Sequence, residues 1–144
     1  MRTMTSGFAL GGVVAVALLA GCAGTDYMAT GQQVRLWGSS EVPPVQTQAY
    51  GTGVVNIGPD RSVTVTLSVI DMVPTAAHIH EGAAGTNGPV IVPLNRISER
   101  AFVAPDNAKI TEAQYAAYKA GNLYVNVHSA KFPNGEVRSQ ILGR

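Results

Sequence analysis

Apolar and polar residues alternate along two stretches of the chain, which is typical of β-strands that bury one face. The clearest stretch spans residues 61–71, and its apolar positions share one face: Val63, Val65, Leu67 and Val69. The second spans residues 123–129, and its apolar positions are Leu123, Val125 and Val127. Successive side chains of a strand point to opposite faces, so we expect these two apolar faces to build the core. The other face of the second stretch carries Tyr124, Asn126 and His128.

Further strands are predicted where short apolar or alternating runs are bounded by Gly, Pro, Asn or Asp. They are residues 34–37, 50–57, 76–81, 90–94, 98–103 and 136–142. One short helix is predicted near residues 111–120, because Thr111 is a suitable N-cap and Gly121 stands where a helix would end. About eight strands and one inserted helix favour an all-β fold, an antiparallel β-sandwich with Greek-key connections.

The chain begins with a short polar segment that contains Arg2, and an apolar run follows over residues 7–21. A membrane-spanning helix needs about 20 apolar residues, so this run is short for one. Its length fits the apolar region of a secretory signal. The run ends in Leu19-Ala20-Gly21-Cys22, which resembles the lipobox of bacterial lipoproteins.

That resemblance implies cleavage before Cys22 and a diacylglycerol on its sulfur, which would hold the protein to a membrane surface without spanning it. We therefore expect a signal peptide over residues 1–21, a lipidated Cys and short tether over 22–32, and one domain over 33–144. Ala23 follows the Cys, and by the same resemblance this favours the outer membrane of a Gram-negative host.

Charge and cysteine content exclude several classes of function. The chain has 10 Lys and Arg against 9 Asp and Glu, so it offers no basic field for nucleic acid. Its single Cys excludes an internal disulfide and a Cys-rich zinc site. Glu81 and Glu136 are not expected to act together as a carboxylate pair. We expect one to cap loop amides and the other to form an ion pair with Arg138.

The three histidines of the chain are its strongest candidate site. His78 and His80 stand at i and i+2 of a predicted strand, so their side chains share a face about 7 Å apart at Cα. A neighbouring strand could bring His128 against them, and three imidazoles suit copper or zinc. The alternative is structural: the histidines hydrogen-bond across strands and order the Gly-rich segment 82–89.

Four sequence blocks occur in an order that resembles the CHRD domain, a family first named from the vertebrate protein chordin and widespread in bacterial exported proteins. The blocks are Ser40-Glu41-Val42-Pro43-Pro44, Ala77-His78-Ile79-His80-Glu81-Gly82, Gly85-Thr86-Asn87-Gly88-Pro89, and Tyr124–His128 with Pro133–Arg138. The resemblance covers roughly residues 33–143. It implies an all-β extracytoplasmic domain and does not imply a settled activity.

A second, weaker resemblance is to the Cu,Zn superoxide dismutases, which place a His-x-His pair and a later Val-His on a Greek-key sandwich. It implies His78, His80 and His128 as copper ligands, with Arg138 near the place of an anion-guiding Arg. Residues 81–89 contain no His or Asp, so the bridging histidine and the zinc ligands of that family are missing. This departure argues against a zinc site and against dismutase activity.

Three functions follow as hypotheses. The favoured one is a lipid-anchored module of the cell envelope with a non-catalytic binding or structural role, whose partner is a protein or a glycan. The second is a copper-binding module that uses His78, His80 and His128. The third is a redox enzyme of the dismutase type, which is the least supported because its reaction centre is incomplete.

Overall fold

A computed structural model describes residues 31–143 of the chain. Nine strands form one sheet, and all neighbouring strands are antiparallel. In chain order they are β1 (Gln32–Trp37), β2 (Tyr50–Ile57), β3 (Val63–Ile70), β4 (Pro74–Glu81), β5 (Val90–Pro93), β6 (Asn95–Arg96), β7 (Ala101–Val103), β8 (Leu123–Ser129) and β9 (Val137–Ile141). A 3-10 helix, η1 (Gly38–Ser40), follows β1, and the helix α1 (Glu112–Lys119) precedes β8. The predicted all-β fold with one short helix is confirmed.

The expected signal peptide, residues 1–21, and the expected lipidation site, Cys22, lie outside the described residues, as does the tether up to residue 30. The described part begins just before β1, whose first residue is Gln32. Within residues 31–143 no helix combines the length and the hydropathy that crossing a membrane requires.

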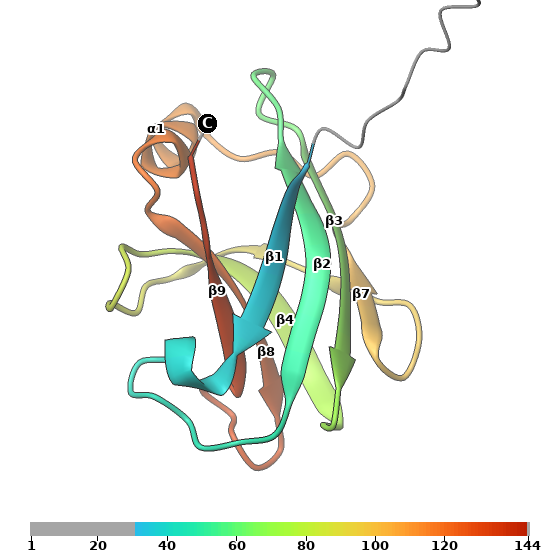
Figure 1. Cartoon of the computed structure of the whole chain (residues 1–144). Coiled ribbons are helices and arrows are strands. Elements are labelled where there is room, and N and C mark those ends of the chain that lie inside the picture. The colour runs from blue at the N-terminus through green and yellow to red at the C-terminus, as the bar shows by residue number, and fades with distance from the viewer. Residues whose placement is uncertain (1–30, 144) are drawn as a thin grey trace, which may run out of the picture.

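The sheet curls until its two edges almost meet. Its order is β5-β4-β8-β9-β1-β2-β3-β7-β6, which places β5 and β6 at opposite edges. Only Leu94 separates these two strands in the chain, and its N–H donates to the carbonyl oxygen of Ala77 in β4 at 2.9 Å. The two expected layers are therefore parts of one continuous sheet, with β1, β2 and β3 in front of β4 and β8 in Figure 1.

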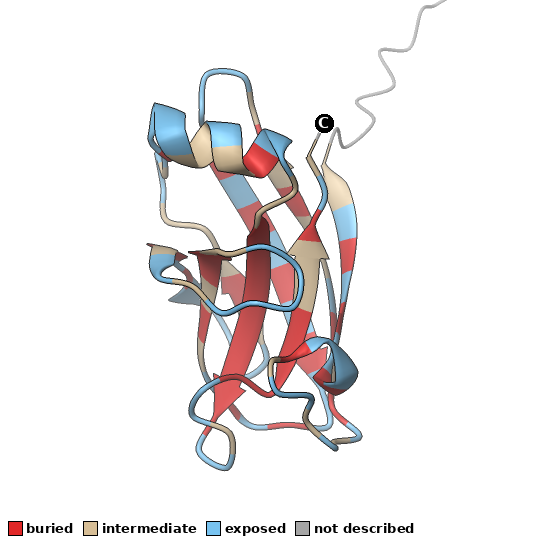
Figure 2. Ribbon diagram, turned by 90° about the vertical axis from the view of Figure 1, so that its left-hand side faces the viewer, coloured by how far each residue is buried: buried red, intermediate tan, exposed pale blue. Residues whose placement is uncertain are grey.

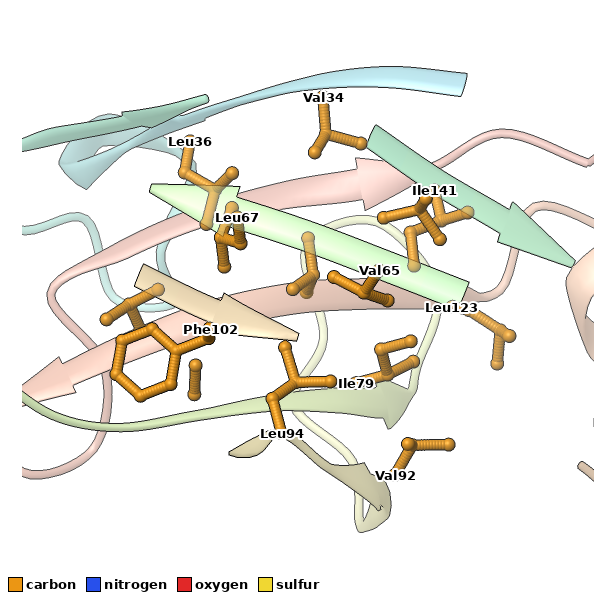
Figure 3. Packing of buried hydrophobic residues seen from close by; sticks show 14 of the residues in the cluster. Val34, Leu36, Val65, Leu67, Ile79, Val92, Leu94, Phe102, Leu123 and Ile141 are labelled. Atoms are coloured by element: carbon orange, nitrogen blue, oxygen red, sulfur yellow. The ribbon is translucent and has the colours of Figure 1, made fainter. Parts of the chain in front are cut away.

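The core lies inside this curled sheet. Burial alternates along all eight residues of β3, with Val63, Val65, Leu67 and Val69 inside. From the opposite side Leu123, Val125 and Val127 of β8 are buried as predicted, together with Ile79 of β4. Phe102 of β7, which pairs with Leu67 of β3, is buried as well (Figure 3). Each such side chain contributes about 1.5 to 3 kcal/mol when it is removed from water. The two alternating faces predicted from the sequence thus form the main core.

Strand β8 departs from the alternation that the sequence predicts. All seven of its residues are buried, whereas buried and exposed residues alternate along β3 (Figure 2). Tyr124, Asn126 and His128 point away from the core, yet they are only 2%, 2% and 8% exposed. They are covered because the connections 82–89 and 130–135 turn back over this part of the sheet, as their hydrogen bonds to Tyr124 and His128 show.

Helix α1 begins as predicted. The hydroxyl of Thr111 accepts from the backbone N–H of Gln114, and the Gln114 side chain accepts from the backbone N–H of Thr111, which makes a complete capping box. The helix ends at Lys119, and Gly121 has a φ of +75°, the left-handed conformation that favours Gly after a helix. The buried ring of Tyr118 attaches the helix to the core.

One predicted strand is shorter than expected. Residues 98–100 form the bend of a hairpin, and only Ala101–Val103 pair as β7. They pair with β3 on one side and with β6 on the other. Strand β6 was not predicted because two exposed residues carry no alternation. The Arg96 side chain closes this hairpin by donating to the carbonyl oxygens of Ser98 and Glu99.

Candidate metal centre

The structure brings the three histidines together on the outer side of the sheet. His78 and His80 lie on β4, and their neighbours Ala77 and Ile79 point into the core. Strand β8 pairs with β4, and His128 stands opposite Ala76, one step diagonally from His78. Because i and i+2 side chains of a strand share a face, this register places the third imidazole beside the first two.

The ring nitrogens are close enough to share one ion after a small adjustment. His78 Nδ1 lies 2.9 Å from His128 Nε2, and one nitrogen from each of the three rings lies within 4.8 Å of the others. Two nitrogens bound to one ion at ordinary Zn–N distances are at most about 4.2 Å apart. The gap is a fraction of an ångström, which a rotation of a ring can close.

Backbone carbonyl oxygens determine which ring nitrogen carries a proton in His80 and His128. His80 Nδ1 lies 2.9 Å from the carbonyl oxygen of Gly88, and His128 Nδ1 lies 3.0 Å from that of Pro133. A carbonyl oxygen only accepts, so Nδ1 carries a proton in both rings, and in the neutral form of either ring the lone pair is on Nε2. His128 Nε2 accepts from His78 Nδ1, whereas His80 Nε2 is buried and has no hydrogen-bond partner among the described residues.

The pKa of His78 is lowered to about 4 because the ring is desolvated and lies beside the imidazoles of His128 and His80. Burial also lowers the pKa of His128, against the opposing effect of its bond to Pro133. These two rings are therefore neutral at pH 7, the protonation state in which imidazole binds metals.

Tyr124 and the segment 82–89 cover the histidines. The Tyr124 ring stacks on His80 with centroids 4.7 Å apart and planes within 5°. Gly88 lies so close to the sheet that a Cβ on it would overlap the carbonyl of Glu81. The Gly-rich segment 82–89 also supplies the hydrogen bond from the Gly88 carbonyl oxygen to His80. From the sequence we expected such a bond only if the histidines have a structural role and bind no metal.

Arg138 was expected to form an ion pair with Glu81 or Glu136, or to lie near the place of an anion-guiding Arg, and the structure places it differently. It is 1% exposed, and its guanidinium lies 3.4 Å above the centroid of the Tyr124 ring. It makes no ion pair, since the single ion pair of the described part joins Lys109 to Asp60. Glu136 accepts instead from the Thr47 hydroxyl. The predicted pairing of Arg138 with Glu136 or Glu81 is wrong because the guanidinium is buried under a loop whose carbonyls it binds.

Glu41 is a buried carboxyl that the sequence analysis did not single out. It is 5% exposed, and burial raises its pKa to about 7, against the opposing effects of the Arg138 charge and of Asn126. Glu41 Oε1 and Asn126 Oδ1 are buried without a partner among the described residues. The only sequence signal was the position of Glu41 in the first of the four ordered blocks.

A protein-family model supports the resemblance suggested by the four blocks. The model of the CHRD domain matches residues 32–141, which include all nine strands and the three histidines. The comparison with curated proteins gave no significant match, and neither did the comparison with solved structures. The match begins at the first strand and ends with the last, so the chain belongs to the CHRD domain family.

Proposed function

We propose that this CHRD domain binds a transition-metal ion, with copper preferred, through His78, His80 and His128. The observation that carries the proposal is the group of three histidines, each with one ring nitrogen within 4.8 Å of the others. In the same group the buried Nε2 of His80 has no hydrogen-bond partner among the described residues. A buried acceptor without a partner costs about 1 to 3 kcal/mol. A bound cation would remove that cost and would use the neutral state of His78 and His128.

Copper is preferred on chemical grounds. Imidazole ligands suit copper, zinc and nickel, and divalent copper binds most tightly in this series to a given set of nitrogen ligands. Three protein ligands also leave a position for water or another small ligand. We assign no catalytic role, because the sequence lacks the zinc ligands and bridging histidine that a dismutase centre needs.

We place this metal site on a lipid-anchored envelope protein. Support comes from the sequence: the apolar run over residues 7–21 and the Leu19–Cys22 box are typical of an exported lipoprotein. The domain would then lie at the outer membrane, on its periplasmic or surface face, in a host with two membranes. The membrane would be its first partner, reached through the lipid on Cys22.

The test is a titration of the full chain, purified without chelator, with Cu(II). We expect one ion per chain and broadening of the NMR signals of all three histidines. The double variant His78→Ala, His80→Ala should lose this binding, and Cys22→Ala should keep it because the thiol is not a ligand. Absence of binding in the wild type, or binding unchanged in the double variant, would refute the proposal.

Anchoring is tested separately by fractionating cells that express wild-type chain or Cys22→Ala. We expect the wild type in the membrane fraction and the variant, which cannot accept a diacylglycerol, in the soluble envelope fraction. The same distribution for both would contradict the lipid anchor and leave the metal site unaffected.

A second candidate is a binding or structural module that needs no metal and takes an envelope protein or a glycan as its partner. One observation favours it: each histidine already has a hydrogen-bond partner, His128 for His78, Gly88 for His80 and Pro133 for His128. On this hypothesis the imidazoles order the two covering loops. Capture of a partner by the metal-free wild type, together with no binding of copper, would favour it.

A further inference from the structure

Tyr124 makes two contacts that converge on His80. It stands directly opposite His80 in the β4–β8 register, and the two rings are stacked. Its hydroxyl accepts from the backbone N–H of Gly88 at 3.2 Å and lies 3.5 Å from the Gly88 carbonyl oxygen. That carbonyl oxygen is the partner of His80 Nδ1. Tyr124 therefore holds both the ring of His80 and the group that fixes its proton.

Arg138 contacts the opposite face of the Tyr124 ring and the loop residues that precede Gly88. It lies on β9, and β4 and β9 flank β8, so the Tyr124 ring is held between His80 and the guanidinium. The guanidinium donates to Asn87 Oδ1 at 3.2 Å and to the Thr86 carbonyl oxygen at 2.9 Å. Both residues immediately precede Gly88. A planar group with several fixed donors restricts the loop more than a single contact would.

The hydrogen bond between His128 Nδ1 and the Pro133 carbonyl oxygen does not involve Tyr124 or Arg138. Pro133, the partner of His128 Nδ1, lies in the connection between β8 and β9, and no hydrogen bond of the described residues joins it to Tyr124 or Arg138. A change at Tyr124 should therefore act on His80 and leave His128 as an internal reference.

We infer that Tyr124 and Arg138 are positioning residues of the metal centre, which hold the Gly88 carbonyl against His80 Nδ1 so that His80 Nε2 stays free for an ion. The inference rests on the proposed function for its metal-binding consequence. Partners of this kind fix the tautomer of a ligating histidine, and their loss typically weakens metal binding by about 10- to 100-fold.

The experiment compares Tyr124→Phe with the wild type in the full chain. Phe keeps the ring that stacks on His80 and removes only the hydroxyl that binds Gly88. Nitrogen NMR of the imidazoles in the metal-free protein at pH 7 reports the tautomer, and a Cu(II) titration reports the Kd. Tyr50→Phe is the matched control, because Tyr50 lies on β2 and stacks on Trp37 instead.

We expect His80 in the wild type to carry its proton on Nδ1 alone. In Tyr124→Phe it should become a mixture of tautomers, His128 should stay unchanged, and the Kd for Cu(II) should rise about 10-fold. Arg138→Lys keeps the positive charge and loses the planar set of guanidinium donors. It should also change His80 toward a mixture of tautomers. If Arg138→Lys does not fold, Tyr124→Phe alone decides.

A Tyr124→Phe protein with the wild-type His80 tautomer or the wild-type Kd would overturn the inference. A wild type that binds no copper would instead refute the proposed function, while the tautomer of His80 in the metal-free variants would still show whether Tyr124 positions that ring. The two failures are therefore distinguishable.

Discussion

His78 Nδ1 lies 2.9 Å from His128 Nε2, although the two residues are 50 positions apart in the chain. The bond joins two neighbouring strands at the outer side of the sheet. In the metal-free protein a proton lies between the two nitrogens, and in our proposal an ion takes over this link. Stability with and without metal therefore reports directly on this pair.

His128→Ala should destabilise the metal-free protein. The change removes two part-buried hydrogen bonds, one to the Pro133 carbonyl and one to His78 Nδ1, and a typical hydrogen bond contributes about 0.5 to 1.5 kcal/mol. Urea unfolding at pH 7 measures this difference in the free energy of unfolding. An unchanged midpoint would show that water replaces the imidazole without cost.

Cu(II) should raise the melting temperature of the wild-type chain. An ion that binds only the folded state at a free concentration of 100 times its Kd adds about 2.7 kcal/mol of stability. Differential scanning calorimetry measures the shift, and a chelator should reverse it. The double variant His78→Ala, His80→Ala is the control, and an equal shift in it would assign the effect to other ligands.

Glu41→Gln should stabilise the protein above pH 7. The pKa of Glu41 is raised from 4.5 to about 7, so the folded state binds more protons than the unfolded state between these values. Stability from this group is present at low pH and is lost as the pH rises through the folded pKa. At pH 8 the neutral amide should therefore gain about 2 to 3 kcal/mol.

The measurement is urea unfolding of wild type and Glu41→Gln at pH 5 and pH 8. The two proteins should differ little at pH 5, where the carboxyl is protonated in the folded state, and most at pH 8. A difference that is the same at both pH values would show that Glu41 titrates normally.

Val65→Asp should unfold the domain. Val65 is 4% exposed in the middle of β3, and a carboxylate there would be buried without a partner. Circular dichroism at 25 °C should show loss of the β signal, whereas Thr66→Asp, on the exposed face of the same strand, should keep it. Near-native melting of Val65→Asp would show that this face of β3 is not the core.

The strands were predictable where local alternation decides burial. β3 and the inner face of β8 follow the period of two, and the capping residues of α1 are adjacent in sequence. The strand β6 was missed because two exposed residues show no alternation of apolar and polar positions. They form a strand only because they pair with β7.

The candidate site was predictable only in part. Alternation places His78 and His80 on one face, and pairing of β4 with β8 adds His128. The burial of Tyr124 and Arg138 was not predictable, because it comes from loops that fold back over the sheet and not from the strands themselves. The same covering explains why Arg138 binds carbonyl oxygens where an ion pair was expected.

The most direct test of the central proposal is electron paramagnetic resonance of the full chain loaded with one equivalent of Cu(II), with pulsed detection of the remote imidazole nitrogens. We predict three coordinated imidazoles in the wild type and in Cys22→Ala, and two in each of His78→Ala, His80→Ala and His128→Ala. A wild-type spectrum without imidazole nitrogens, or one that none of these three variants alters, would contradict a metal centre at His78, His80 and His128.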